Sequence, residues 1–120
     1  MFKSKKGLIR AEIVTVGNEV VSGLIQDTNA RYLSGQLHSL GIDVPRMTSV
    51  GDDESAIVDA IEQALERAEI VIMTGGLGST HDDITKAVLA RMFQSEMVTD
   101  QKAVAMLEGL FRKFQREVPL

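Results

Sequence analysis

The sequence predicts an α/β fold with three layers, in which a mainly parallel sheet has helices on both of its faces. Two observations lead to this prediction: short β-branched, apolar runs alternate with segments of helical periodicity, and the order is strand, helix, strand, helix, strand, helix. Right-handed crossovers join such strands into a parallel sheet flanked by helices. No linker rich in Pro, Gly and Ser divides the 120 residues, so we expect one domain over residues 10–120 behind an N-terminal tail at residues 1–9.

Three segments have the composition of strands. Ala11–Val16 is β-branched and apolar and runs directly into Gly17. Asp43–Val50 contains Pro45, which has no N–H donor and therefore suits the start of a strand or the edge of a sheet. Glu69–Thr74 is apolar almost throughout, which predicts a central strand covered on both faces.

Four segments carry apolar residues at helical spacing. The expected helices cover Asn29–Leu40, Ser55–Arg67, Asp83–Phe93 and about residues 100–116. Their inward-facing residues are expected to be, in chain order, Leu33, Leu37 and Leu40; Ile57, Val58, Ile61, Ala64 and Leu65; Val88, Leu89 and Met92; and Val104, Leu107, Phe111 and Phe114. Gly41 is a natural stop for the first helix, and the acidic residues of "GDDE" suit the positive end of the second.

Composition and charge exclude several classes of protein. The formal net charge is -4, and the single basic cluster, "KSKK" at residues 3–6, is typical of a solvated tail. A general nucleic-acid binder needs clustered Lys and Arg. The absence of cysteine excludes disulfides, thiolate nucleophiles and Cys-ligated zinc. Since no apolar run is long enough to span a bilayer and residues 1–10 lack the apolar core of a signal peptide, we expect a cytoplasmic protein that binds neither nucleic acid nor membrane.

The loops after the three strands are the best candidates for a ligand site. They read "GNEVVSG" at residues 17–23, "GDDE" at residues 51–54 and "GGLGSTHDD" at residues 75–83. In a parallel sheet these loops emerge at one edge, and a strand order of 2-1-3 would create a switch point there, where ligands bind. Each loop contains glycine, which allows close backbone approach, and at least one carboxylate.

The third loop predicts an anion site. Gly75, Gly76 and Gly78 leave backbone N–H groups uncovered beside the start of the next helix, and this combination accepts a phosphate or pyrophosphate. Ser79 and Thr80 add hydroxyl donors. The loop is not a Walker A motif, because no Gly-Lys-Ser/Thr follows, and the first loop lacks the spacing of the dinucleotide fingerprint.

The acidic residues of the three loops have a structural and a functional interpretation. Asp82 or Asp83 can cap the following helix, hold a divalent metal ion that bridges to phosphate oxygens, or position water for attack. Glu19 follows a strand directly and stands between two glycines, which favours function. By spacing alone, Asp52 and Asp53 look like N-caps of the second helix.

Three other polar residues are less decisive. Asn29 in "DTNA" can cap the first helix or hydrogen-bond a ligand, and the sequence does not separate these two roles. His81 could act as a base or a phosphate donor, but without an evident partner it reads as a loop residue. His38 is expected on the surface of a helix.

Three motifs taken together resemble the N-terminal domain of the CinA family of competence/damage-inducible proteins, a branch of the molybdopterin-binding fold. They are "TVGNEVVSGLIQDTNARYLSGQLHSLGIDV", "VGDDE" and "TGGLGSTHDDITK", which match in order and in spacing. The resemblance covers most of the chain and implies a three-layer α/β fold with a ligand crevice where these loops meet. In the molybdenum-cofactor relatives this pocket holds molybdopterin. In the CinA branch the similar domain is associated with metal-aided hydrolysis of the pyrophosphate of ADP-ribose.

The resemblance also implies roles for individual residues. Phosphate or nucleotide binding falls on Gly17, Asn29, Gly75, Gly76, Gly78, Ser79 and Thr80. Metal binding falls on Asp52, Asp83, Glu19 and Asp82, with Mg²⁺ or a similar divalent ion expected and K⁺ as a second candidate. Catalysis falls on Asp52 and Asp83. The predicted function is therefore hydrolysis of ADP-ribose or a similar nucleotide derivative; the alternatives are a non-catalytic module that binds molybdopterin or a nucleotide, and a structural or regulatory fragment.

The chain departs from the CinA pattern in three places. Ser79 replaces a common proline, and His81 replaces a common lysine, which would remove a phosphate contact unless the histidine supplies it. The family's domain continues beyond Leu120 with further strands and a later glycine-rich loop, so the resemblance predicts a domain truncated at its C-terminal end. We expect a homo-oligomer, a dimer or trimer, because the family forms both and a thin sheet with an exposed apolar helix face would gain from a partner.

Overall fold

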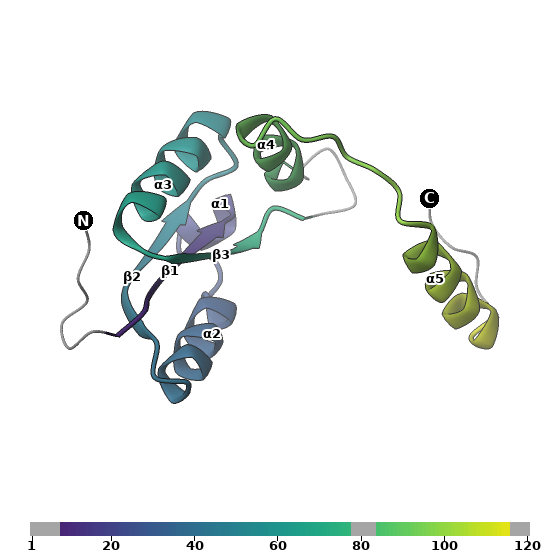
Figure 1. Ribbon diagram of the computed structural model, residues 1–120, viewed down its shortest axis with the longest axis horizontal. Coiled ribbons are helices and arrows are strands. Elements are labelled where there is room, and N and C mark those ends of the chain that lie inside the picture. The colour runs from purple at the N-terminus through teal and green to yellow at the C-terminus, as the bar shows by residue number, and fades with distance from the viewer. Residues whose placement is uncertain (1–7, 78–83, 116–120) are drawn as a thin grey trace.

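The computed structural model describes residues 8–77 and 84–115. The elements in these ranges are β1 (Arg10–Val16), α1 (Asn18–Val21), α2 (Thr28–Ser39), β2 (Asp43–Val50), α3 (Glu54–Arg67), β3 (Ile70–Gly75), α4 (Thr85–Met92) and α5 (Gln101–Lys113). The three strands are parallel and lie in the order β2-β1-β3. Figure 1 shows α2 on one face of the sheet and α3 and α4 on the other. The predicted three-layer α/β fold is confirmed, and the observed strand order is the one that would place a switch point beside β1.

Strand β1 is the centre of the molecule, because its side chains alternate between two separate cores. All residues from Ala11 to Val16 are buried. On one face Ala11 and Ile13 pack against Ala30 and Leu37 of α2. On the other face Val16 packs with Ile57 and Ile61 of α3 and with Val88 of α4.

Strand β3 is not the central strand that its composition predicts. It lies at the edge of the sheet, pairs with β1 and is half-buried along its whole length. Its apolar side chains pack on both faces, with Ile70 and Ile72 against the α2 core and Met73 against the α3 core. The apolar composition of the strand therefore predicts correctly that side chains pack on both of its faces, but it does not predict how many strands pair with it.

Strand β2 occupies the other edge, as Pro45 predicts. Arg10 pairs with Asp43 whereas Glu12 pairs with Arg46, so β2 has one more residue than β1 between these two pairs. This irregularity is a β-bulge, and Pro45 lies inside it. A bulge is a position where a strand tolerates a residue without an N–H donor.

The predicted helices are confirmed, although their ends and some inward residues differ. Helix α4 begins at Thr85 rather than Asp83, and α5 covers Gln101–Lys113. The short α1 was not predicted. Leu40 is 75% exposed, because it lies just past the last residue of α2, where it caps the helix. Leu65 is 47% exposed.

Helix α5 is amphipathic but buries none of its residues. In Figure 1 it stands apart from the sheet and from the other helices. Of the predicted inward residues of this helix, Leu107 and Phe114 are exposed, and Val104 and Phe111 are half-buried. None of the helices in residues 8–77 and 84–115 combines the length and the apolar composition needed to cross a bilayer.

Candidate functional site

The three strands end side by side at one edge of the sheet. Val16 pairs with Val50 of β2 and with Gly75 of β3, so the three loops that follow begin at the same level. The N–H of Gly17 donates to the carbonyl of Val50 at 2.9 Å and continues this pairing into the first loop. The predicted meeting of the loops at the carboxyl edge, around a switch point beside the central strand, is therefore what the backbone shows.

The first two loops are held together by Asn18 and Asp52. The side-chain Oδ1 of Asn18 accepts from the backbone N–H of Asp52 at 3.0 Å, and the N–H of Asn18 donates to Oδ2 of Asp52 at 3.4 Å. This reciprocal pair fixes the position of the Asp52 carboxylate. Asn18 was not among the predicted site residues, although its position between the first strand and Glu19 is a signal that the sequence contains.

Asp53, and not Asp52, is the N-cap of α3. Its Oδ2 accepts from the N–H of Ala56 at 2.9 Å and from the hydroxyl of Ser55 at 2.7 Å. The hydrogen bond from Ser55, followed by that from Ala56, lowers the pKa of Asp53 from its ordinary value. Because Asp53 alone serves as the cap, the interpretation of Asp52 as a plain cap is wrong, and its carboxylate is available at the edge where the loops meet.

Glu19 lies over the backbone at the end of β1. A Cβ atom added to Gly17 would stand 2.7 Å from Oε1 of Glu19, so the carboxylate occupies the space that a side chain would take. Gly17 has an extended φ of 163°, a conformation that any residue adopts. Its glycine identity thus serves the close approach of the Glu19 carboxylate rather than a special backbone conformation.

Gly75 and Gly76 are required by the turn that leaves β3. Their φ angles are 88° and 65°, in the left-handed region that favours glycine. A Cβ atom at Gly75 would collide with the carbonyl oxygen of Val16, and one at Gly76 with the hydroxyl of Thr85. The two glycines therefore have a structural role whether or not a phosphate binds beside them.

Thr85 anchors this turn to the start of α4. It is 3% exposed, and its hydroxyl donates to the carbonyl of Gly75 at 3.0 Å. From its sequence, Thr85 was expected only as one residue of the helix at Asp83–Phe93. The rest of the predicted anion loop lies outside the described residues: Gly78, Ser79, Thr80, His81, Asp82 and Asp83.

Asn29 does not cap α2. Oδ1 of Asp27 accepts from the N–H of Ala30 at 3.0 Å and supplies the cap. The amide Nδ2 of Asn29 instead points toward the end of β3, where it donates to the hydroxyl of Thr74 at a long 3.5 Å. The structure therefore excludes helix capping, one of the two roles that the sequence left open, and leaves hydrogen bonding to a ligand. His38 lies exposed on α2, as predicted.

The structure thus brings the described members of the predicted site to one edge: Gly17, Glu19, Asn29, Asp52, Gly75 and Gly76. Within residues 8–77 and 84–115, no group of three or more His, Asp or Glu side chains is placed to hold a metal ion. Glu19 and Asp52 are the two described acids of the predicted metal set. Asp82 and Asp83 fall outside the described residues, so the full set stays a prediction.

Comparison with known proteins identifies the family of the chain that carries this site. The model of the probable molybdopterin binding domain family matches residues 12–119. A putative competence-damage inducible protein from Bacillus cereus strain B4264 is 47% identical over 109 residues, which make up 91% of this chain and 26% of the relative. The chain thus spans about a quarter of the length of the curated relatives it matches.

Solved structures show the same relationship. The protein CinA from Thermoplasma acidophilum is 33% identical, with a TM-score of 0.77 over 92% of this chain and 64% of that one. The tungsten cofactor synthesizing protein MoaB from Pyrococcus furiosus is 25% identical, with a TM-score of 0.66 over 78% of this chain and 58% of that one. The resemblance to the CinA branch is confirmed by these matches. The chain belongs to the probable molybdopterin binding domain family.

Proposed function

We propose that this domain binds a phosphate-bearing pterin of molybdopterin type, or a nucleotide, at the carboxyl edge of its sheet. The observation that carries the proposal is the pairing of Val16 with both Val50 and Gly75, which sets the three loops around one switch point. Membership of the molybdopterin-binding family supports the pterin, and the similarity to MoaB agrees with it.

The polar groups at this edge suit such a ligand. Gly75 and Gly76 lead from the end of β3 into the segment before α4, and a glycine-rich segment before a helix start is a common site for a phosphate. Asn29 and Thr74 offer an amide and a hydroxyl on the adjoining face. Their mutual contact is long, so both retain capacity for hydrogen bonds to a ring edge or a sugar.

A second candidate is hydrolysis of the pyrophosphate of ADP-ribose with the help of a metal ion. It is favoured by the two carboxylates, Glu19 and Asp52, that neighbouring loops bring to this edge. These two acids do not by themselves form a metal-binding group among the described residues. The candidate therefore depends on Asp82 and Asp83, and we assign no reaction step to the metal.

Calorimetric titration with molybdopterin and with ADP-ribose tests the binding proposal. Removing one hydrogen bond by Asn29→Ala should weaken binding by roughly 2- to 10-fold. Gln36→Ala is the matched control, because it truncates an exposed amide on the same helix away from the loops. If neither ligand binds or raises the melting temperature, the proposal is wrong.

Hydrolysis is tested separately by incubating the chain with ADP-ribose and Mg²⁺ or K⁺. Release of AMP and ribose phosphate that is lost in both Asp52→Asn and Asp83→Asn would establish the second candidate. Binding of either ligand without any product would leave the binding function standing and remove the hydrolytic one.

A further inference from the structure

Asn18 forms two hydrogen bonds to a single residue of the second loop. Its side-chain Oδ1 accepts from the backbone N–H of Asp52, and its own backbone N–H donates to Oδ2 of Asp52. In the part of the chain that the structure describes, no group donates to the other carboxylate oxygen, Oδ1 of Asp52. The half-buried carboxylate is therefore held through one oxygen and keeps the other as a hydrogen-bond acceptor.

Gly51 is a glycine because Asn18 fills the space beside it. A Cβ atom added to Gly51 would stand 2.6 Å from Oδ1 of Asn18, which is shorter than the contacts that real Cβ atoms make. Apart from the chain neighbours of Gly51, Asn18 is the only described residue within 4 Å of that position. The φ angle of Gly51 is not in the left-handed region, so its backbone alone does not require glycine. The start of the second loop thus accommodates the Asn18 side chain.

The ends of the three strands set the distance between the two sides of the site. β2 and β3 flank β1 on opposite sides, so Asp52 follows one outer strand and Gly75 ends the other. Two strand spacings of about 4.8 Å separate these strands by about 10 Å. Since a carboxylate repels a phosphate, the phosphate of a bound ligand belongs on the β3 side, and a group that donates hydrogen bonds belongs on the β2 side.

We infer that Asn18 is a positioning residue, which holds the Asp52 carboxylate so that its second oxygen accepts a hydrogen bond from the bound ligand. The inference rests on the proposed function and adds the direction in which the ligand lies. The ligand group at Asp52 carries an N–H or O–H, because an ionised carboxylate only accepts. This group stands about 10 Å from the phosphate, two strand spacings away. The amino groups of a pterin ring and of an adenine base are donors of this kind.

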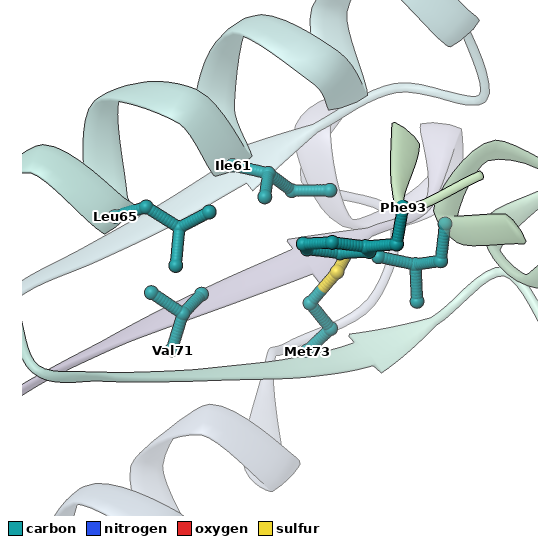
Figure 2. Close-up of a pocket in the computed structure, with 6 residues that line it drawn as sticks. Ile61, Leu65, Val71, Met73 and Phe93 are labelled. Atoms are coloured by element: carbon teal, nitrogen blue, oxygen red, sulfur yellow. The ribbon is translucent and has the colours of Figure 1, made fainter. Parts of the chain in front are cut away.

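The apolar pocket beside β3 does not compete for such a ligand. It has a volume of about 270 Å³ and is lined by six apolar side chains: Ile61, Leu65, Val71, Met73, Leu89 and Phe93. Figure 2 shows Ile61 and Leu65 of α3 facing Val71 and Met73 of β3, with Phe93 at one end. A phosphate or an amino group placed there would lose its hydrogen bonds to water without finding a partner among these side chains. The polar ligand is therefore expected at the carboxyl edge.

Calorimetry on a double-mutant cycle tests the role of Asn18, with molybdopterin and ADP-ribose as the ligands. Asn18→Ala should weaken binding by roughly 2- to 10-fold, and Asp52→Ala by at least as much. The double variant should bind no more weakly than Asp52→Ala alone, within about twofold, because Asn18 acts through the carboxylate. A role limited to fastening the two loops would persist in Asp52→Ala, since alanine retains the backbone N–H that donates to Asn18.

Two further variants complete the cycle. Ser22→Ala is the matched control in the same loop: it removes a hydroxyl that donates to the carbonyl of Glu19 at 3.3 Å, and it should change the affinity less than about twofold. Gly51→Ala should weaken binding as Asn18→Ala does. It should have no further effect in a chain that already carries Asn18→Ala, because that truncation removes the colliding oxygen. Far-UV circular dichroism checks that each variant is folded.

Hydrogen exchange of the Asp52 amide, measured without ligand, should be faster in Asn18→Ala and in Gly51→Ala than in the natural chain. If Asn18→Ala leaves this exchange unchanged, Asn18 does not hold Asp52 and the inference is wrong. Additive losses in the double variant, an Asp52→Ala chain that binds as tightly as the natural one, or a Gly51→Ala chain with full affinity would each overturn the inference and leave the proposed binding function intact. If the natural chain binds neither ligand, the proposed function fails and the inference fails with it.

Discussion

The ion pair between Glu12 and Arg67 allows the sharpest test of how this fold is stabilised. Glu12 lies in the central strand β1 and is 1% exposed. Both of its carboxylate oxygens accept from Arg67 of α3, one from Nε and one from Nη2, each at 2.9 Å. This two-point contact is the strong geometry for a guanidinium and a carboxylate, and it raises the pKa of Arg67.

We predict that Arg67→Met destabilises the fold by about 3 kcal/mol, because it leaves the Glu12 carboxylate buried without its partner. Unpaired buried charges cost about 3–5 kcal/mol, and the lower end applies since water reaches the guanidinium; the Arg67 side chain is 26% exposed. The loss would be a large part of the roughly 5–15 kcal/mol by which small domains are stable. Urea unfolding followed by circular dichroism measures it as a shift of the midpoint at constant slope.

Two further variants separate the burial of a charge from the loss of a contact. The double variant Glu12→Leu with Arg67→Met should recover to within about 1 kcal/mol of the natural protein, because no charge then remains buried. Arg91→Met removes the pair between Arg91 and Glu54, whose side chains are 58% and 52% exposed, and should cost less than about 1 kcal/mol. Glu12 does not depend on Arg67 for compensation of a buried charge if Arg67→Met costs no more than Arg91→Met, or if the double variant is as unstable as the single one.

Other measurements test the turns and caps. Gly76→Ala should destabilise by roughly 1–3 kcal/mol, because a side chain in the left-handed region also collides with Thr85. Gly35→Ala, in the interior of α2 with open space around it, should instead stabilise by about 0.5–1 kcal/mol in the same urea assay; equal effects at the two positions would contradict the account. Asp53 contributes stability in its charged form, because its pKa is lower in the folded state than its ordinary value of 3.8. That contribution is present above about pH 3.8 and is lost as the pH falls through the folded pKa, so thermal unfolding of Asp53→Asn should lose less stability on acidification than the natural protein; a parallel loss would refute this.

Much of the fold was predictable because its signals are local. The composition of the three strands and the helical spacing between them led to the correct layers, and Pro45 led to the correct edge for β2. The position of β3 was predicted wrongly, since an apolar strand looks the same whether one or two strands pair with it. Helix α5 showed the pattern of a buried helix, but its pattern carries no information on what buries it.

The sequence predicted which loops meet at the site, but it did not predict the role of each acidic residue in them. The sequence located three loops that meet, yet it could not decide whether Asp52 or Asp53 caps α3, because both stand at capping distance from the helix. Asp52 is instead held in the first loop's direction by its hydrogen bond with Asn18, which lies 34 residues away in the sequence. Glu12 was overlooked for the same reason: an acid within "AEIVTV" is explained only by Arg67, 55 residues further along the chain.

The bulge in β2 makes the two margins of the sheet unequal partners for any additional strand. At the β2 margin an incoming strand would meet a missing donor at Pro45 and an interrupted spacing of backbone groups. At the β3 margin the pairing with β1 runs without a shift from Ile70 to Gly75, so the outward backbone groups keep a regular spacing. A further strand, whether it comes from the same polypeptide or from another molecule during aggregation, therefore pairs more readily with β3 than with β2.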